Sequence, residues 1–305
     1  MKAAICTAYG PPEVLKLMTV AQPEPKEFDL LIRVYASAVQ SGDRRIRALD
    51  VPPAGRLPMR IALGFKAPRK PVLGVVVAGE VAAVGSRVQH FKVGDRVYGL
   101  TGMRLGGYAE YACIHAHKCI HLMPLNASFN EAASLPFGGT TALHFLRKAQ
   151  IEQANSVLIY GASGAVGSAA VQIAKYYNTH VTAVCSDRHA AMVRDFGADE
   201  VIDYHMDDYD NQLSTYDAVF DASGKINKLS ARKHVERNGQ FCSVAGQGVA
   251  KELREDLTLL NQMFEAGHFK AVIDRVYPLE EIVEAHRYVD SGRKYGNVIV
   301  QVVEE

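Results

Sequence analysis

The sequence has no tryptophan, almost no net charge and no long apolar run. Its 34 basic and 33 acidic residues leave a formal net charge of +1, so no overall electrostatic attraction to nucleic acid or to a membrane follows. No apolar stretch reaches the roughly 18 residues that a membrane-spanning helix needs. The first residues, MKAAICTAYGPPEVLKL, lack the long apolar core of a signal peptide. We therefore expect a globular protein with neither nucleic-acid nor membrane partners.

Cysteine is also scarce. The chain has five cysteines, at positions 6, 113, 119, 185 and 242. A scattered, odd-numbered set does not form a disulfide framework and is typical of a reducing compartment, so we expect a cytoplasmic protein. The hydrophobic fraction of 48% is enough for one or two sizeable cores.

The chain has two regions with different sequence patterns. Up to about residue 122, short segments rich in β-formers alternate with glycine and proline, which predicts a compact, largely antiparallel unit. The expected strands lie at 30–36, 75–84, 96–98 and 108–114. The stretch 51–71 carries five prolines and clustered basic residues, and we expect it to be irregular.

From about residue 130 the texture changes to alternating helices and strands. Helices are expected at 140–149, 166–176 and 188–196, and strands at 156–160, 180–185 and 218–221. This alternation predicts an α/β fold with a parallel sheet covered on both faces. A last helix at 279–291 precedes a strand at 297–303, and a return of that strand to the first unit's sheet would make that unit discontinuous.

The strongest signal is the segment VLIYGASGAVG at 157–167. An apolar strand runs into glycines spaced as Gly161-x-x-Gly164-x-x-Gly167, and a helix begins at once. Glycine permits a tight turn and close backbone approach, and the helix N-terminus presents N–H groups to a diphosphate. Any tight strand–helix turn could carry three glycines, but a second strand follows at the distance that a dinucleotide-binding unit requires.

The end of that second strand distinguishes between two dinucleotides. An NAD site usually has Asp or Glu there, to hold the ribose hydroxyls. This chain has Ser186, with Arg188 two residues on. A hydroxyl and a guanidinium suit a 2′-phosphate, because arginine binds its oxygens in a planar fork. Asp187 could repel that phosphate or cap the helix at 188–196, and we favour the cap. The pattern predicts NADPH.

Several motifs together resemble the zinc-free, quinone oxidoreductase-like branch of the medium-chain dehydrogenases/reductases. The matching stretches are 9–15, 71–85, 91–97, 106–111, 131–143, 161–167, 196–204 and 284–298. The resemblance implies a GroES-like, mainly β catalytic domain over 1–124, completed by 267–305. It also implies a Rossmann cofactor-binding domain, a doubly wound parallel sheet, over 125–266, with the active site in the cleft between the two.

Zinc-dependent relatives hold their metal with three thiolate or imidazole ligands. At the matching positions this chain has Gln40, the segment GVVVAGE at 74–80 in place of a Gly-His-Glu motif, and Phe137 where a cysteine would lie. Without thiolate or imidazole, tight zinc binding is not expected. Cysteine and histidine also alternate over 113–121, as on one strand face, but the resemblance implies a turn near 116–118. There we expect an exposed strand end and not a metal site.

The resemblance also implies a catalytic set. Gln40 and Thr141 would lie near the nicotinamide riboside, and Gln40 could donate an N–H to the substrate oxygen or simply cap a loop. Asp43 would fix the cleft loop and would not act as an acid. The implied cofactor contacts are Gly161, Ala162, Gly164, Ala165, Val166, Gly167, Ser186, Arg188, Tyr204, Ala222, Ser223, Val244, Ala245, Lys294, Gly296 and Asn297.

Hydride transfer needs the nicotinamide to face its acceptor and needs little acid–base machinery. We therefore predict a zinc-independent, NADPH-dependent reduction of a quinone or an activated enone. Two alternatives stay open. One is an NADPH-binding sensor or structural protein with little turnover. The other is a carbonyl or alcohol oxidoreductase, which normally needs a Lewis acid to polarise the carbonyl.

A homodimer is a further expectation. Relatives carry a helix and an additional strand after the position of Gly246, and that strand often pairs across a dimer. This chain passes from Gly246 to Lys251 almost directly. The shortened segment puts the dimer in doubt.

Overall fold

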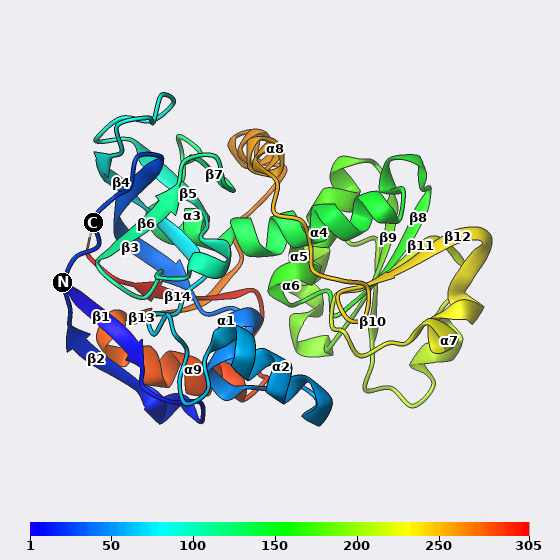
Figure 1. The fold of residues 1–305 in the computed structure, drawn as a ribbon. Coiled ribbons are helices and arrows are strands. Elements are labelled where there is room, and N and C mark those ends of the chain that lie inside the picture. Colours follow the sequence, from blue (N-terminus) through cyan, green and yellow to red (C-terminus); the bar gives the residue numbers. More distant parts are fainter. Residues whose placement is uncertain (305) are drawn as a thin grey trace. The chain divides into compact units, whose positions relative to one another are not determined.

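The computed structural model describes residues 1–304, which form two compact units (Figure 1). Unit 1 contains Met1–Pro136 and the chain from Ile273 onward, and unit 2 contains Phe137–Val272. The divisions at 136 and 272 lie beyond the 124 and 266 expected from the sequence. One reason is the helix α3 (Phe129–Ser134), which packs against the unit 1 strands β3 (Asp29–Ala38) and β4 (Val76–Val84).

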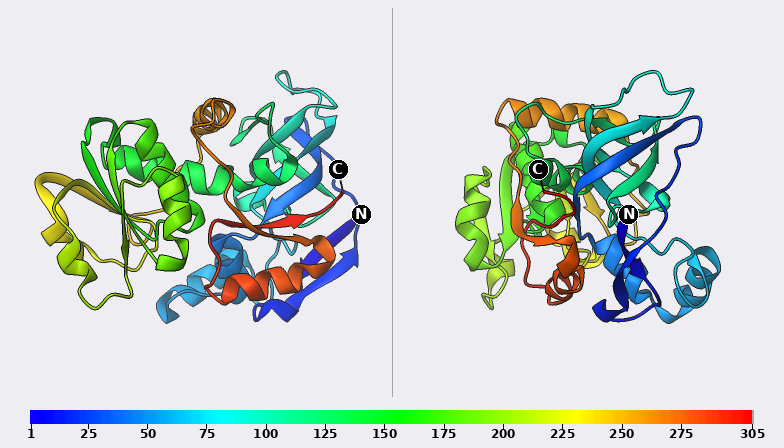
Figure 2. Two further views of the ribbon diagram at one scale, coloured as in Figure 1. Left: turned by 180° about the vertical axis from the view of Figure 1, so that it is seen from behind. Right: turned by 90° about the vertical axis from the view of Figure 1, so that its left-hand side faces the viewer.

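Unit 1 is built on a seven-stranded sheet. Its path runs β13 (Ile273–Pro278), β14 (Asn297–Gln301), β3, β4, β5 (Arg96–Leu100) and β7 (Ile120–Leu122), while β6 (Tyr111–His115) also pairs with β3. β14 pairs antiparallel with β3, with Ile299 opposite Ala38, so the expected return of the C-terminal strand to the first unit is observed (Figure 2). A separate hairpin joins β1 (Lys2–Cys6) and β2 (Leu15–Thr19).

Three further helices complete unit 1: α1 (Ser41–Ala48), α2 (Pro53–Leu63) and α9 (Ile282–Asp290). The expectation that 51–71 is irregular is wrong for α2. Pro52 and Pro53 occupy the N-cap and first helical positions, where a missing N–H costs no helical hydrogen bond. Met59 and Leu63, four residues apart, then pack on the apolar cluster that also contains Val39, so tertiary contacts stabilise a helix that the prolines seemed to forbid.

Unit 2 has the predicted parallel sheet. Its strand order is β10 (Glu200–Asp203), β9 (His180–Cys185), β8 (Ser156–Tyr160), β11 (Tyr216–Asp221) and β12 (Val235–Ser243), and every neighbouring pair is parallel. Its helices are α4 (Pro136–Lys148), α5 (Ala165–Tyr176), α6 (Ala190–Asp195), α7 (Lys228–Ala231) and α8 (Arg254–Glu265). Val157, Leu158 and Ile159 on β8 are fully buried, as expected for a strand in the middle of a parallel sheet.

Within residues 1–304, no helix combines the length and the apolar character needed to cross a membrane.

Candidate functional site

The carboxyl ends of the unit 2 strands carry most of the expected cofactor residues. Because all five strands are parallel, the segments that follow them lie at one edge of the sheet. Two backbone hydrogen bonds join neighbouring strand ends there, from Ala222 N to Tyr160 O at 3.1 Å and from Val244 N to Asp221 O at 3.1 Å. β9 and β10 lie on one side of β8, and β11 and β12 lie on the other. Ligands of open α/β sheets bind outside such a switch point.

The glycine turn between β8 and α5 has a different requirement at each glycine. Gly161 has φ of +71°, where a side chain is strained, and its backbone N–H donates to Val184 O at 3.0 Å. A Cβ on Gly167 would lie 2.1 Å from Gly161 O, so only glycine lets α5 approach the turn. A Cβ on Gly164, the N-cap of α5, would meet only Gly161 O, at 3.5 Å.

The space at Gly164 is where a diphosphate would fit. The first N–H groups of α5, those of Ala165, Val166 and Gly167, have no partners within the helix, as at any helix start. They can donate to phosphate oxygens, and the helix dipole favours negative charge at this end. This turn therefore suits the diphosphate of a dinucleotide.

Asp221, at the end of β11, organises the neighbouring turn and was missed by the sequence analysis. Its buried carboxylate accepts hydrogen bonds from the backbone N–H groups of Ser223, Gly224 and Ile226, each at 3.0 Å. It also accepts from the hydroxyls of Ser223 at 2.6 Å and Ser243 at 2.9 Å. One carboxylate thus fixes both segments expected to flank the nicotinamide ribose. The only signal in the sequence is an Asp at a strand end before Ala-Ser-Gly.

Ser186 and Arg188 follow β9 at the same edge. Ser186 is 8% exposed and is the N-cap of a 3-10 turn, Asp187–His189, which precedes α6. The proposed capping role of Asp187 is therefore wrong, because Asp187 is the first residue inside the turn. Arg188 is exposed, and Tyr204, which follows β10, is 47% exposed and packs against His205.

Thr141 lies half-buried on α4. Gly138, one turn earlier on that helix, lies so close to α5 that a Cβ would come within 2.4 Å of Ala165 O. The helix that carries Thr141 is therefore packed against the start of α5, beside the glycine turn.

In unit 1, Gln40 and Asp43 form the start of α1. Gln40 is the N-cap, and its backbone N–H donates to Asp43 Oδ2 at 3.0 Å. The other carboxylate oxygen, Oδ1, accepts from Gly74 N at 3.0 Å. Gln40 Nε2 donates to Asn297 Oδ1 at 3.2 Å. Gln40, Asp43 and Asn297 are at most 3% exposed, so the structure gathers three of the expected residues into one buried group.

Burial raises the pKa of Asp43 from its usual 3.8 to about 6. Hydrogen bonds from the backbone of Gln40, Gly74 and Val75 and from the Tyr108 hydroxyl act in the opposite direction, because they stabilise the carboxylate. A carboxylate that accepts bonds from two separate chain segments fixes the backbone at both, as expected for a residue that holds a loop.

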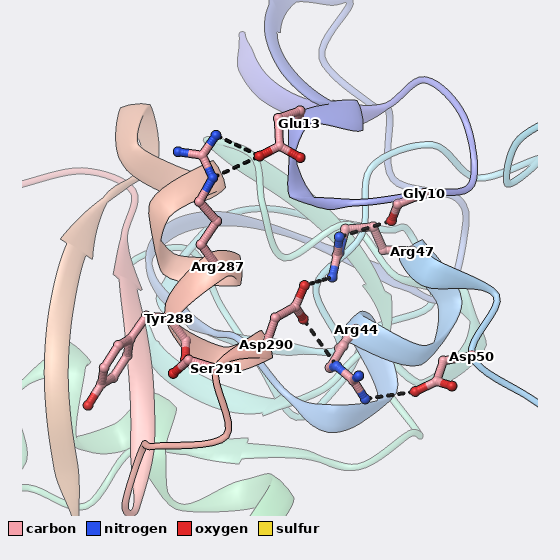
Figure 3. Close-up of polar contacts among 9 residues, drawn as sticks. All are labelled: Gly10, Glu13, Arg44, Arg47, Asp50, Arg287, Tyr288, Asp290 and Ser291. Carbon is pink, nitrogen blue, oxygen red and sulfur yellow. Dashed lines mark hydrogen bonds and ion pairs between the residues drawn. The ribbon is translucent and has the colours of Figure 1, made fainter.

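Two arginines on α1 fix the helix against α9 (Figure 3). Arg47, only 1% exposed, donates to Asp290 Oδ2 at 2.5 Å and to Gly10 O at 2.9 Å. Arg44 donates to the other oxygen, Asp290 Oδ1, at 3.1 Å and to Asp50 at 2.8 Å. The helix whose first turn holds Gln40 is thus anchored at its far end by an ion pair with one buried partner.

Lys294 and Gly296 lie in the segment between α9 and β14, just before Asn297. Lys294 Nζ donates to Gly296 O at 2.7 Å. Desolvation lowers the pKa of Lys294 from its usual 10.5 to about 8, against the attraction of Asp274. Asp274 also accepts from Tyr295 N at 3.1 Å and so fixes this segment.

The described residues contain no group of three or more His, Cys, Asp or Glu side chains arranged to hold a metal ion. The alternating cluster at 113–121 is interrupted as expected. β6 ends at His115, a turn follows, and β7 begins at Ile120.

Comparisons with known proteins agree with this architecture. A family model described as an alcohol dehydrogenase GroES-like domain matches residues 26–124. Two models described as zinc-binding dehydrogenase match residues 165–273 and 248–300.

The similar proteins include two plant enzymes. A 2-methylene-furan-3-one reductase from Solanum lycopersicum is 35% identical over 99% of this chain and 79% of its own length. A chloroplastic NADPH-dependent alkenal/one oxidoreductase from Arabidopsis thaliana is 33% identical over 98% of this chain and 79% of its own. Among solved structures, the quinone oxidoreductase from Coxiella burnetii matches with a TM-score of 0.85 and 29% identity, over 99% of both chains.

Proposed function

The chain belongs to the quinone oxidoreductase-like branch of the medium-chain dehydrogenases/reductases, and on this premise we propose that it transfers a hydride from NADPH to a quinone or an activated enone. The observation that carries the proposal is the turn at Gly161–Gly167, whose glycines leave a helix N-terminus open to a diphosphate. Bound NADPH supplies the hydride.

The residues of this chain bind and orient. Ala165, Val166 and Gly167 donate backbone N–H groups to the diphosphate. Ser186 and Arg188 hold the 2′-phosphate, Tyr204 covers the adenine, and the turns at Ala222–Ser223 and Val244–Ala245 flank the nicotinamide ribose. Lys294, Gly296 and Asn297 are the cofactor contacts that we propose from unit 1.

Gln40 acts on the substrate in this proposal. It donates an N–H to the oxygen that gains negative charge as the hydride is transferred, which is the usual way a protein lowers the barrier of such a step. Thr141 contacts the nicotinamide riboside. Asp43 is a positioning residue, because its carboxylate holds the backbone of Gln40. A proton from solvent or from a nearby group completes the reduction to the hydroquinone or the saturated ketone.

We include zinc independence in the proposal, although the matching family models are described as zinc-binding. Its support is the donor set, because Gln40 and Phe137 offer neither thiolate nor imidazole. Zinc-dependent alcohol oxidation needs such ligands to hold the metal.

The test is a substrate panel with the purified chain. Nicotinamide absorbance is followed with NADPH and a series of quinones, α,β-unsaturated carbonyls and saturated aldehydes, each with a metal chelator and with added zinc. The expected result is turnover with a quinone or an enone that the chelator does not change. Tight NADPH binding without any turnover would identify a sensor or structural protein. Turnover of saturated aldehydes only, and only with zinc, would identify a carbonyl reductase.

The homodimer and the location belong to the proposal as well. A dimer formed by this chain would use the free edge of β12, because residues 244–253 form bends and coil where relatives carry another strand. Light scattering on the purified chain gives its molar mass and so shows whether a dimer forms. A cytoplasmic location is supported by the five cysteines, all of which are free thiols.

A further inference from the structure

The segment from α2 to β4 carries a strong excess of basic residues. No acidic residue occurs over 51–79, while five cations do: Arg56, Arg60, Lys66, Arg69 and Lys70. The net charge of +1 for the whole chain conceals this local excess, because the acidic residues lie elsewhere.

The same segment exposes large apolar side chains. Leu57 and Ile61, one helical turn apart on α2, are 61% and 54% exposed, and Phe65, just beyond the helix, is 57% exposed. Met59 and Leu63 already bind α2 to the core. The helix therefore has a second apolar face that its own packing does not use. Exposed apolar side chains gathered with cations mark an interaction surface.

Contacts with Tyr9 and Arg60 fix the end of α2 and the backbone of Phe65, whose side chain is exposed to solvent. The Tyr9 hydroxyl donates to Gly64 O at 2.8 Å, and the Arg60 guanidinium lies 5.4 Å from the centre of the Tyr9 ring and donates to Phe65 O. Arg60 is thus used internally. Arg56 and Lys66 are exposed and point their charge at solvent.

A basic pocket adjoins this helix. It has a volume of about 480 Å³, and its lining includes Lys26, Arg69, Lys70 and Arg104. Arg69 donates to Ala62 O on α2 at 3.3 Å, which ties the pocket to the helix. Arg104 is held by the buried carboxylate of Asp29 at 2.7 Å, so that pair is neutral. Lys26, Arg69 and Lys70 leave an excess of positive charge over Glu24, the other acid in the lining, and Lys70 Nζ donates only to a carbonyl, Met103 O, at 2.9 Å. The pocket suits a phosphate group.

We propose that this surface, formed by α2, Phe65 and the adjoining basic pocket, docks onto an anionic lipid bilayer. Leu57, Ile61 and Phe65 enter the boundary between headgroups and acyl chains. Arg56, Lys66, Arg69 and Lys70 bind lipid phosphates. Amphipathic helices with basic residues beside exposed apolar ones bind membrane interfaces in this way, without crossing them. Nucleic acid is disfavoured as the partner, because two of the three exposed apolar side chains are aliphatic and cannot stack on bases.

The inference does not depend on the proposed reaction. It does suit a reductase of apolar quinones and enones, since such molecules partition into bilayers. It is a proposal contrary to the expectation, drawn from the overall charge, that the chain has no membrane partner.

The test is flotation of the full chain with vesicles of phosphatidylcholine alone and of phosphatidylcholine with phosphatidylglycerol. The expected result is co-flotation with the anionic vesicles only, lost at high salt because surface charges are then screened. The double variant Arg56→Glu/Lys66→Glu should bind at least about 25-fold more weakly, since each cation contributes about fivefold. Leu57→Ser/Ile61→Ser should abolish flotation.

The control variant is Leu125→Ser/Leu229→Ser, which removes two apolar side chains that are 91% and 83% exposed but lie outside this surface. It should float like the unmodified chain. Absence of flotation, equal flotation with neutral vesicles, or unchanged flotation of the α2 variants would each overturn the proposal. So would a loss of dimerisation or of DNA binding in the Leu57→Ser/Ile61→Ser variant without any vesicle binding by the unmodified chain.

Discussion

Gln40 Nε2 donates to Asn297 Oδ1 at 3.2 Å. This hydrogen bond joins the N-cap residue of α1 to the first residue of β14, 257 positions later in the sequence. The bond fixes the amide plane of a buried side chain. A fixed donor costs no reorganisation when charge develops on a substrate oxygen, and this is the condition under which a single hydrogen bond contributes strongly to a rate.

The first prediction concerns this amide. Gln40→Leu should lower kcat/KM for the best quinone or enone by about 100-fold, because the oxygen loses its donor. The Kd for NADPH should change little, and calorimetry measures it separately. Gln89→Leu, at an exposed position, is the control and should leave both quantities unchanged. An unaltered kcat/KM in Gln40→Leu would show that Gln40 only caps a loop and does not act on the substrate.

The second prediction separates binding from folding in the glycine turn. Gly164→Ala places a methyl group in the space that we propose for the diphosphate, so the Kd for NADPH should rise at least about tenfold, with a stability loss near 1 kcal/mol from the weaker cap. Gly167→Ala drives a Cβ to 2.1 Å from Gly161 O and should cost about 3 kcal/mol of folding free energy. Urea unfolding measures the stability of each variant, and calorimetry measures its affinity for NADPH. Equal effects of the two variants on stability would contradict it.

Cofactor choice is the third prediction. Arg188→Ala should lower the ratio of kcat/KM with NADPH to that with NADH by about 10-fold to 100-fold, the value of a hydrogen bond to a charged group. Activity with NADH should stay near its original level, because NADH has no 2′-phosphate. Arg194→Ala, an exposed arginine on α6, serves as the matched control. A parallel loss with both cofactors would show a structural role for Arg188.

The fourth prediction is a pH dependence. The pKa of Asp43 is about 6 in the folded protein and 3.8 when unperturbed, so between these values the folded state binds more protons than the unfolded state. Folding stability from this group therefore falls by about 3 kcal/mol as pH rises from 4 to 6, and is constant above that range.

Asp43→Asn should remove this slope in urea unfolding measured from pH 4 to 7. It should also destabilise the protein by about 1–3 kcal/mol, because an amide cannot accept from both Gln40 N and Gly74 N without leaving a donor unpaired. Asp207→Asn, at an exposed position, should keep the original slope. The same slope in both variants would show that other groups cause it.

Local sequence signals predicted the parts of this protein whose causes are local. The strand at 180–185 and the glycine turn follow from apolar periodicity and from the backbone freedom of glycine, so their positions were predictable. α2 was not, because its prolines are visible in the sequence, whereas the contacts of Met59 and Leu63 that stabilise it are tertiary.

The candidate site divides in the same way. The turn at Gly161–Gly167 is contiguous and was found. Asp221 was missed because its partners include Ser243, which lies 22 residues away on another strand. The bond from Arg47 to Asp290 joins residues 243 positions apart. No local pattern in the sequence indicates such a contact.

The fifth prediction compares two acids, Asp290 and Glu13, whose ion pairs join α9 to earlier segments of unit 1 (Figure 3). Asp290 pairs with Arg47, which is 1% exposed, whereas Glu13 pairs with Arg287, which is 47% exposed. Asp290→Ala leaves the Arg47 charge buried without its counter-ion, which should cost about 3 kcal/mol of folding free energy. The cost is reduced slightly because an acid at the end of a helix opposes the helix dipole.

Glu13→Ala should leave stability unchanged within error, because water and salt screen an exposed pair. Urea unfolding of the two variants at neutral pH measures the difference. If α1 positions Gln40 through its anchor on α9, Asp290→Ala should also lower kcat while the Kd for NADPH stays constant. Equal stabilities of the two variants would contradict the role given to burial, and a normal kcat in folded Asp290→Ala would show that Asp43 and Asn297 alone hold Gln40 in place.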